Sequence, residues 1–503
     1  QEAQGEKFGW QSVVPPPIPD DQNFAFSPVW VAAVKYGYFN DEKLKAWYGD
    51  RAYRQDISNL ASLFPVSVST VTGTNWWRLP QLPVNSNPWT FSKSLDLKRW
   101  QSFYRGLGSS NAAAGILIAP HPQTPAQDVL LALSKFDPVI EQLRQDSKLP
   151  YSRFPIQYDG MPAAILLPHL GVESQIAQVL QVRAVAELQN GENEKALGDI
   201  KLMIRFLDAN RTESFLISHL VRLIILNFTL QPIWEGLADH KWSDAQLVDL
   251  DRELAGQDFL ADGKFSMRGE RSLEIADIEF LQHPTLAPAH LSFLAPLSLV
   301  PMLANMSSDD GRAMNIPRSL ALAVGPSGWL EQNKLSIAQF NIFWQLPIID
   351  ENAKIVSPAK FHAAEDALDQ EKKHPSLKNV MVSLFIPDWH NAVEKFAHAQ
   401  SSINLARVAI ALERYRLAHG EFPESLAGLA PQFIAQIPHD VINGGSLLYR
   451  RTPDGQFVLY SVGWNETDDG GVLVAGKGDL SHDESKLPID LNQGDWVWKY
   501  PAK

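Results

Sequence analysis

The spacing of apolar residues between about 125 and 280 is the feature that most constrains the fold. Residues on one predicted helix face recur every three or four positions: Ile176, Val179, Leu180, Ala184 and Leu188. The pattern stops at Asn190-Gly191, a typical helix end. A second series with similar spacing follows Glu192: Leu197, Ile200, Ile204 and Leu207. The sequence therefore predicts a hairpin of two antiparallel helices over about 172–208.

The turn of this hairpin has a second interpretation. The string AVAELQNGENEKAL (184–197) resembles the inter-helix turn of a tetratricopeptide repeat, with Leu188, Gly191 and Ala196 near the expected small and apolar positions. One such unit is visible, whereas an array needs about three to stabilise itself. A generic helix pair and a helical-repeat adaptor for a protein partner therefore both remain open.

Residues 212–230 form the most apolar predicted helix, which is hydrophobic nearly all round and should be buried. His219 and Arg222 lie three positions apart and share one face of it. A buried charge needs a partner, and the segment 268–271 with Glu274 offers carboxylates for that role. We predict a buried polar network of four residues: His219, Arg222, Glu270 and Arg271.

The same region holds the candidate catalytic residues. A histidine beside a glutamate in a polar cluster can act as a general acid and base, which selects His219, Glu270 and Glu274. The alternative is a salt-bridge network that only joins two helices. The sequence contains no G-x-S-x-G elbow, H-E-x-x-H pair or phosphate-binding loop. We therefore expect binding or assembly rather than catalysis, with a carbohydrate-active hydrolase using the Glu pair as the alternative.

Charge and cysteine content exclude several classes of protein. The 503 residues include 44 Lys and Arg against 57 Asp and Glu, a net charge of -13, and we find no segregated basic patch. Such a chain repels phosphate backbones, so nucleic acid is not an expected partner. Cysteine is absent, which excludes zinc-thiolate sites, iron–sulfur clusters, cysteine nucleophiles and disulfides.

The first 120 residues are rich in proline and tryptophan. The run Pro15-Pro16-Pro17 fixes an extended backbone without internal hydrogen bonds, so this segment needs a neighbouring surface to be ordered. We expect an irregular segment packed on a helical core, with tryptophans as anchors: Trp76, Trp77, Trp89 and Trp100. A sugar-stacking platform is the alternative, because flat amphipathic rings suit pyranose faces. A glycan or an envelope protein is therefore the expected partner.

The start of the chain predicts a location outside the cytoplasm. Residues 1–7 contain neither an initiator Met nor an apolar stretch, so we expect a chain from which a signal peptide or membrane anchor has been removed. The longest uncharged run, 283–308, carries four prolines, so we expect no membrane-spanning helix there. These features predict a periplasmic or cell-surface protein.

The last hundred residues change from a helical to a strand pattern. The expected elements are a helix ending at His419-Gly420, strands over 446–450 and 456–461 around a Pro453-Asp454-Gly455 turn, and a last strand over 496–500. The turn residues are typical of a β-hairpin. We expect the last strand to close this small sheet.

A loop rich in Gly, Asn and Asp follows the hairpin. The side chains of Asn465, Asp468 and Asp469 offer three oxygens within five positions, and Gly470 permits a tight backbone. Calcium prefers oxygen ligands, so we predict a calcium site here. Two later carboxylates could complete it: Asp479 and Asp483. The alternative is a loop whose Asn and Asp side chains cap their own backbone.

Residues 400–472 resemble the globular part of the major pseudopilin of type II secretion systems. The resemblance rests on three strings in order: ALERYRLAHGEFPESLAGLAP (411–431), IPHD (437–440) and FVLYSVG followed by DDGG (457–471). It implies a long helix on a small antiparallel sheet, with calcium bound by the acidic loop. Here the helix follows some 400 other residues, so filament assembly is not implied.

The whole chain is similar to a group of large envelope proteins of verrucomicrobial and planctomycete type, to which no activity is assigned. Four strings carry this resemblance: VPPPIPDDQNFA (14–25), ISHLVR (217–222), RGER (268–271) and GDWVWKYP (494–501). It implies a place in the bacterial cell envelope and no chemistry.

These observations predict a mainly α fold in three parts. The parts are an irregular Pro/Trp-rich segment packed on the core (1–120), a helical domain (121–395) and a pseudopilin-like α+β module (396–503). The predicted function is an extracytoplasmic, non-catalytic binding or assembly protein whose ligand the sequence does not name.

Overall fold

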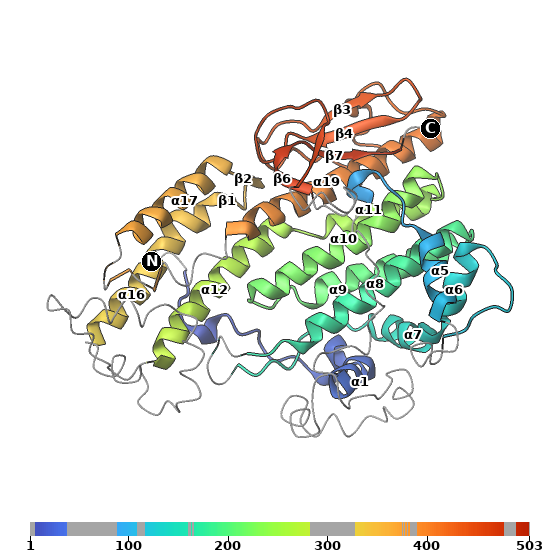
Figure 1. Cartoon of the computed structure of the whole chain (residues 1–503). Coiled ribbons are helices and arrows are strands. Elements are labelled where there is room, and N and C mark those ends of the chain that lie inside the picture. Colours follow the sequence, from blue (N-terminus) through green and yellow to red (C-terminus); the bar gives the residue numbers. More distant parts are fainter. Residues whose placement is uncertain are drawn as a thin grey trace.

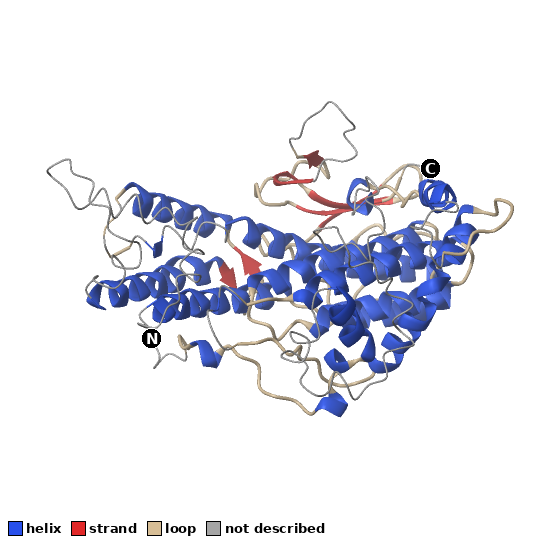
Figure 2. Cartoon of the chain, turned by 60° about the horizontal axis from the view of Figure 1, so that its bottom comes forward, coloured by secondary structure: helices blue, strands red, loops and turns tan. Residues whose placement is uncertain are grey.

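The computed structural model describes residues 6–37, 88–107, 116–158, 162, 165–281, 327–374, 376, 378–379, 381–382, 390–476 and 489–501. The protein is mainly helical, with a few small antiparallel sheets in its C-terminal region (Figures 1 and 2). The predicted fold class is confirmed at this level. The predicted divisions at about 120 and 395 stay predictions.

Helices make up the first half of the described chain. They are α1 (Pro28–Gly37), α5 (Leu97–Leu107), α6 (Pro125–Leu133), α7 (Asp137–Asp146), α8 (Pro168–Gln189), α9 (Asn193–Ala209), α10 (Leu216–Ala238), α11 (Asp244–Ala255) and α12 (Phe259–Leu281). The predicted hairpin is present as α8 and α9, and the backbone between them turns at Gly191, where φ is +81°. Only glycine adopts such a φ without strain.

The second half adds three long helices and short strands. The helices are α16 (Ser327–Phe340), α17 (Pro358–Lys373) and α19 (His390–His419). A π-helical turn over Asn341–Gln345 follows α16, and β1 (Ile349–Asp350) pairs with β2 (Ile355–Val356). The predicted C-terminal helix is α19, and it begins well before the apolar positions that predict it.

The C-terminal sheet confirms the predicted hairpin and its closing strand. Strands β3 (Leu448–Arg451), β4 (Phe457–Ser461) and β7 (Trp496–Lys499) form an antiparallel sheet in the order β3-β4-β7. Leu459 of β4 stands opposite Trp498 of β7. A second pair consists of β5 (Leu473–Ala475) and β6 (Ile489–Gly494). The three-stranded sheet lies on α19, which also packs against α10 and α11 (Figure 1).

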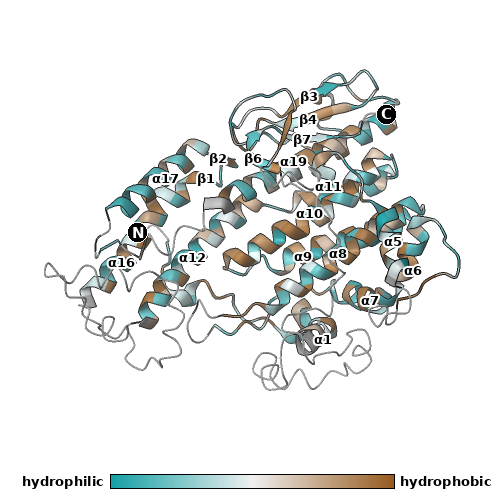
Figure 3. Ribbon diagram, viewed as in Figure 1, coloured by the Kyte–Doolittle hydropathy of each residue, from teal (hydrophilic) through white to brown (hydrophobic). Residues whose placement is uncertain are grey.

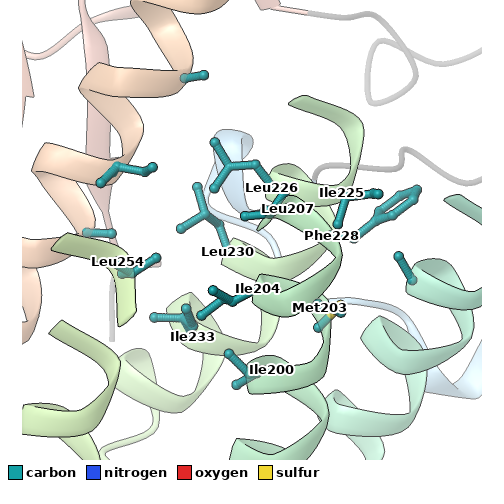
Figure 4. Packing of buried hydrophobic residues seen from close by; sticks show 14 of the residues in the cluster. Ile200, Met203, Ile204, Leu207, Ile225, Leu226, Phe228, Leu230, Ile233 and Leu254 are labelled. Carbon is teal, nitrogen blue, oxygen red and sulfur yellow. The ribbon is translucent and has the colours of Figure 1, made fainter. Parts of the chain in front are cut away.

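One continuous hydrophobic cluster runs through the described residues, from Phe24 to Tyr500. Apolar side chains of α9 and α10 point toward one another at its centre (Figure 4). These central helices carry long apolar stretches, whereas α17 is mostly hydrophilic (Figure 3). Trp89 and Trp100 are 3% and 2% exposed, as expected of core anchors. Trp76 and Trp77 lie outside the described residues.

Helix α10 is the predicted apolar helix. By length and composition it is the one described helix that could cross a membrane, but 67% of its apolar window is buried inside the protein. Its burial is incomplete, because Ile217 and Ile224 are 51% and 44% exposed. Most of the surface of this helix is nevertheless covered by the protein itself, as is usual for an apolar core helix. The uncharged run 283–308 lies outside the described residues.

Candidate functional site

His219 and Arg222 meet in the interior, as predicted, and both are fully buried. The Arg222 Nη1 atom lies 3.0 Å from His219 Nδ1 and 2.6 Å from Asp262 Oδ2. The other ring nitrogen, His219 Nε2, lies 2.7 Å from the backbone carbonyl oxygen of Glu213. Burial and the nearby guanidinium lower the pKa of His219 to about 3. The ring is therefore neutral, and both its nitrogens are occupied.

A second buried cluster adjoins the first but is not a nucleophilic triad. The Glu213 carboxylate receives a hydrogen bond from Ser218 Oγ at 2.5 Å and lies 2.9 Å from His169 Nε2. All three side chains are inaccessible. In a triad the histidine stands between the hydroxyl and the carboxylate, because it must remove the hydroxyl proton. Here the carboxylate stands in the middle, so the cluster joins α8 to the start of α10.

Glu270 and Arg271 do not join His219 and Arg222. The carboxylate that pairs with Arg222 comes from Asp262, earlier on α12. The Glu270 Oε1 atom instead accepts a hydrogen bond of 2.7 Å from the backbone N–H of Leu216 at the start of α10. The predicted four-residue network is thus divided, because the crossing of α12 over α10 brings Asp262, and not Glu270, to Arg222.

The two arginines of the RGER string share Glu6 as a partner, and the string also contacts the chain at Ser214 and Glu351. Arg271 pairs with Glu6 at 3.0 Å and donates to the Lys7 carbonyl at 2.8 Å. Arg268 pairs with Glu351 at 3.1 Å. At Gly269 a Cβ atom would lie 1.9 Å from the carbonyl oxygen of Ser214. This string therefore ties α12 to the N-terminal segment, to the chain before α10 and to the β1–β2 turn.

Glu270 and Glu274 are the carboxyls that a hydrolase would use. Burial raises the pKa of Glu270 to about 7. Burial, with Glu270 and Asp277 as negatively charged neighbours, raises the pKa of Glu274 well above its usual value. Both groups therefore hold their protons more tightly than exposed glutamates do. One of them is already engaged in capping α10.

The predicted calcium loop is held by its own hydrogen bonds. The Asn465 Nδ2 group donates to Asp469 Oδ2 at 2.8 Å. Asp468 Oδ1 accepts from the Gly470 N–H at 2.9 Å and from the Tyr460 hydroxyl at 3.1 Å. These bonds are typical of the self-capping alternative.

A carboxylate that the sequence did not single out organises the same loop. Asp495 is 1% exposed and accepts three backbone N–H groups, from Asp469, Gly471 and Val472, at 3.3, 2.7 and 3.2 Å. The oxygen chemistry suits calcium, but the part of the chain that the structure describes gathers no group of three or more metal-binding side chains. Asp479 and Asp483 lie outside it, so calcium binding stays a prediction.

An open pocket of about 620 Å³ lies elsewhere, between four segments of the chain. The segments are 15–18 and 150–153, the last turn of α9 with the residues after it (205–212), and the end of α11 with its following loop (252–257). Four arginines line it: Arg153, Arg205, Arg211 and Arg252. Sequence reasoning missed this pocket, because it treated 15–18 only as an irregular segment and the arginines are scattered.

Asn23 fixes Arg153 at the edge of this pocket. The buried Asn23 side chain accepts from the Arg153 N–H and donates to the Arg153 carbonyl, both at 2.9 Å. The Arg153 Nε atom then donates to the Pro15 carbonyl at 3.0 Å. The N-terminal segment and the 150–153 segment are therefore joined through one arginine and one amide.

Arg205 and Arg211 shape the opposite part of the lining. Arg205 donates to the backbone carbonyls of Ser147, Leu149 and Tyr151, at 3.1 to 3.2 Å. Arg211 donates to the Gly256 carbonyl at 2.8 Å, which joins the end of α9 to the loop after α11. A carbonyl oxygen carries no net charge, so these hydrogen bonds do not neutralise the positive charges of Arg205 and Arg211.

Comparisons with family models, with curated proteins and with solved structures found no match. The resemblances to a pseudopilin and to envelope proteins therefore stay predictions.

Proposed function

We propose that this chain is a non-catalytic binding protein of the bacterial cell envelope that holds a small ligand in the pocket lined by 15–18, 150–153, 205–212 and 252–257. The observation that carries the proposal is the pocket itself. Its volume of about 620 Å³ falls in the range of about 300–1,000 Å³ that is usual for small-molecule sites.

The chemistry around the pocket favours binding over turnover. No histidine or lysine is among its lining residues, and its carboxylates are Asp208 and Glu253. The predicted catalytic residue His219 has both ring nitrogens occupied within the protein. A general base must reach the proton that it removes. The arginines that line the pocket stay protonated and donate hydrogen bonds, which suits them to holding a ligand unchanged.

The envelope location is part of this proposal and rests on the sequence resemblance stated above. Its expected partners are a glycan or another envelope protein. Fractionation of cells that produce the full-length protein tests it, since an envelope protein is recovered outside the cytoplasm. Recovery in the cytoplasmic fraction alone would contradict it.

A blocking variant tests the pocket. Gly256 is exposed and lines the pocket, and a Cβ atom there meets only the Glu253 carbonyl oxygen, at an ordinary 3.5 Å. Gly256→Trp should therefore fold and fill the pocket. The matched control is Gly328→Trp, at an exposed glycine in α16 with no atom within 4 Å of its Cβ position.

The measurement is a thermal melt of each protein with a panel of soluble glycans and small metabolites. A ligand of the native state raises the melting temperature by mass action. We expect compounds that stabilise the natural chain and Gly328→Trp but not Gly256→Trp. If every stabilising compound also stabilises Gly256→Trp, ligands bind elsewhere and the proposal fails.

One observation favours a hydrolase as the second candidate. The pKa of Glu270, raised to about 7, lies in the range that suits a general acid near neutral pH. Hydrolysis of glycans by the natural chain, lost in both Glu270→Gln and Glu274→Gln, would support this candidate. We favour binding because Glu270 already caps α10.

Calcium at the loop 465–471 is proposed as a separate structural site. If it binds, calcium raises the melting temperature, chelator reverses the rise, and Asp468→Ala with Asp469→Ala removes it. A saturating metal at a hundredfold excess over its Kd stabilises the native state by about 2.7 kcal/mol. Equal melting temperatures in calcium and chelator would rule this site out.

A further inference from the structure

We infer that the pocket binds a small ring-bearing anion, whose carboxylate or phosphate group is held by Arg153 and Arg211 and whose ring lies on the proline and tyrosine wall. This inference rests on the proposed function, because it names the ligand class of the same pocket. A sugar acid and a sugar phosphate share this chemistry.

The charge of the lining is opposite to that of the chain. Among the lining residues four arginines stand against two carboxylates, Asp208 and Glu253, in a protein whose net charge is -13. Outside the lining, Asp249 pairs with Arg252 and Asp262 lies near Arg211, so the positive charges without a paired carboxylate in the described part of the chain are those of Arg153 and Arg205. A concave surface with one sign of charge raises the local concentration of ligands of the other sign. The lining of this pocket therefore favours anions over cations.

Arg153 is the first donor for the anion. Within the described residues it has no carboxylate partner, and its Nε–H is bonded to the Pro15 carbonyl. Its two terminal amino groups therefore have no acceptor in the described part of the chain. A guanidinium presents such groups in a planar fork that matches carboxylate and phosphate. The two Asn23 hydrogen bonds hold the backbone of Arg153 and the Nε bond to Pro15 holds its side chain, so the fork is placed before a ligand arrives.

Arg211 is the second donor. Its nearest carboxylates lie 3.8 Å (Asp208) and 3.7 Å (Asp262) from its nitrogens, which is too long for a hydrogen bond. Its bond to the Gly256 carbonyl uses only Nη2. A ligand oxygen can therefore replace these weak contacts. Arg252 is a poorer donor, since it is largely exposed and already paired with Asp249 at 2.7 Å.

The remaining part of the lining includes an apolar wall. It consists of Pro15, Pro16, Ile18, Pro150 and Tyr151. Tyr151 is 51% exposed, so its ring is available as a surface. Arg205 holds three carbonyls of the 147–151 segment, which keeps this wall in place. Apolar walls with a few placed polar groups are typical of small-molecule sites, and aromatic rings stack well on sugar faces.

The test is isothermal titration calorimetry of the full chain with four probes. The probes are glucuronate, glucose 6-phosphate, glucose and inorganic phosphate. We expect both anionic sugars to bind, glucose to bind at least tenfold more weakly because it lacks the charge, and inorganic phosphate at least tenfold more weakly because it lacks the ring. Stronger binding of one anionic sugar identifies whether the carboxylate or the phosphate is preferred.

Two variants assign the donors, and a third is the control. Arg153→Gln and Arg211→Gln should each weaken binding of the preferred anionic sugar at least tenfold. Arg450→Gln should not change it, although Arg450 likewise bonds a backbone carbonyl, that of Gly470, at 3.1 Å. Thermal melts of the three variants without ligand confirm that each is folded. Unchanged affinity in folded Arg153→Gln and Arg211→Gln would overturn the inference.

The outcomes separate this inference from the proposed function. If glucose binds as tightly as the anionic sugars and Gly256→Trp abolishes binding of all three, the pocket is a ligand site but its ligand is not chosen by charge. If the anionic sugars do not bind while panel compounds still distinguish Gly256→Trp from Gly328→Trp, only the ligand class is wrong. If no compound distinguishes those two variants, the proposed function fails as well.

Discussion

At the residue scale, the hydrogen atom on Cα of Gly269 is all that fits between α12 and the chain at Ser214. A Cβ atom there would lie 1.9 Å from the Ser214 carbonyl oxygen and 2.8 Å from the Ser214 Cβ atom. Because the nearest atoms belong to the backbone of Ser214, rotation of a side chain cannot relieve this clash. The close approach also brings Glu270 to the N–H of Leu216.

Gly269→Ala should therefore lower the free energy of unfolding by about 3 kcal/mol or more, because α12 must move away from residue 214. The control is Gly106→Ala in α5, where no atom lies within 4 Å of the Cβ position. That change should stabilise slightly, since alanine favours helix over glycine by about 1 kcal/mol. Denaturant unfolding measures both, and equal stabilities of the two variants would contradict the close contact.

Glu235 gives a pH-dependent prediction. It is 3% exposed and accepts hydrogen bonds from the Leu95 N–H at 2.9 Å and from Gln231 Nε2 at 2.7 Å. Burial raises its pKa from 4.5 to about 7. Because the folded state binds this proton more tightly than the unfolded state, the contribution of Glu235 to stability is largest below pH 4.5 and falls as pH rises toward 7.

Glu235→Gln should remove this fall, since the amide keeps an acceptor oxygen for Leu95 and has no charge to bury. Relative to the natural chain, the variant should gain stability between pH 4.5 and 7 and keep that gain above pH 7. Urea unfolding at several pH values measures the difference. A difference that does not change with pH would show that Glu235 is not the titrating group.

The burial of a side chain was easier to predict from the sequence than the residues that it contacts. The apolar context of His219 and Arg222 correctly predicted that both are buried. Asp262 was missed as the carboxylate for Arg222, because the crossing point of α10 and α12 depends on side chains along both helices and is not encoded in any one spacing.

At the element scale, the periodicity of apolar residues predicted helices and strands, but it did not predict the hydrogen bonds that fix the loops. The hairpin β3–β4 followed from alternation and a Pro-Asp-Gly turn. The loop after it depends on Asp495, which lies 24 residues beyond Gly471, whose N–H it accepts. No local pattern joins two such positions.

Asp495→Ala should destabilise the protein by about 2 kcal/mol, because three backbone N–H groups lose their acceptor. The control is Asp490→Ala in β6, an intermediate-exposure carboxylate that accepts one N–H, from Asn492, at 3.0 Å. Thermal unfolding compares the two. A loss no larger for Asp495→Ala than for Asp490→Ala would mean that these bonds do not hold the loop.

At the scale of the whole molecule, strand β7 near the C-terminus packs against residues from much earlier in the chain. Trp89 and Trp498 have ring centroids 5.4 Å apart, and the Trp234 indole donates to the Lys499 carbonyl at 3.2 Å. Both contacts join β7 to elements hundreds of residues earlier. The sheet and the helices therefore share one core.

Trp498→Ala should lower the free energy of unfolding by about 3 to 5 kcal/mol and shift a single transition rather than create a second one. Trp498 is fully buried, whereas the control Trp344→Ala removes a ring that is 41% exposed and should cost much less. Calorimetry with far-ultraviolet circular dichroism measures both. A separate early transition of the C-terminal sheet would contradict the shared core.

The pocket belongs to this largest scale, which explains why the sequence did not predict it. Its four lining segments are spread between residues 15 and 257, and no spacing pattern in the sequence joins them. The helices that support two of them were predictable from apolar spacing. Their meeting with the 15–18 and 150–153 segments depends on Asn23 and Arg153, a pair 130 positions apart.

The wall made by Pro15 to Ile18 has an evolutionary consequence. This stretch lies outside the described helices and strands and contributes to the pocket. Changes of length or composition within it alter the shape of the pocket while α9 and α10 keep their packing. If the pocket holds a ligand, as we propose, its ligand preference can diverge through these few residues.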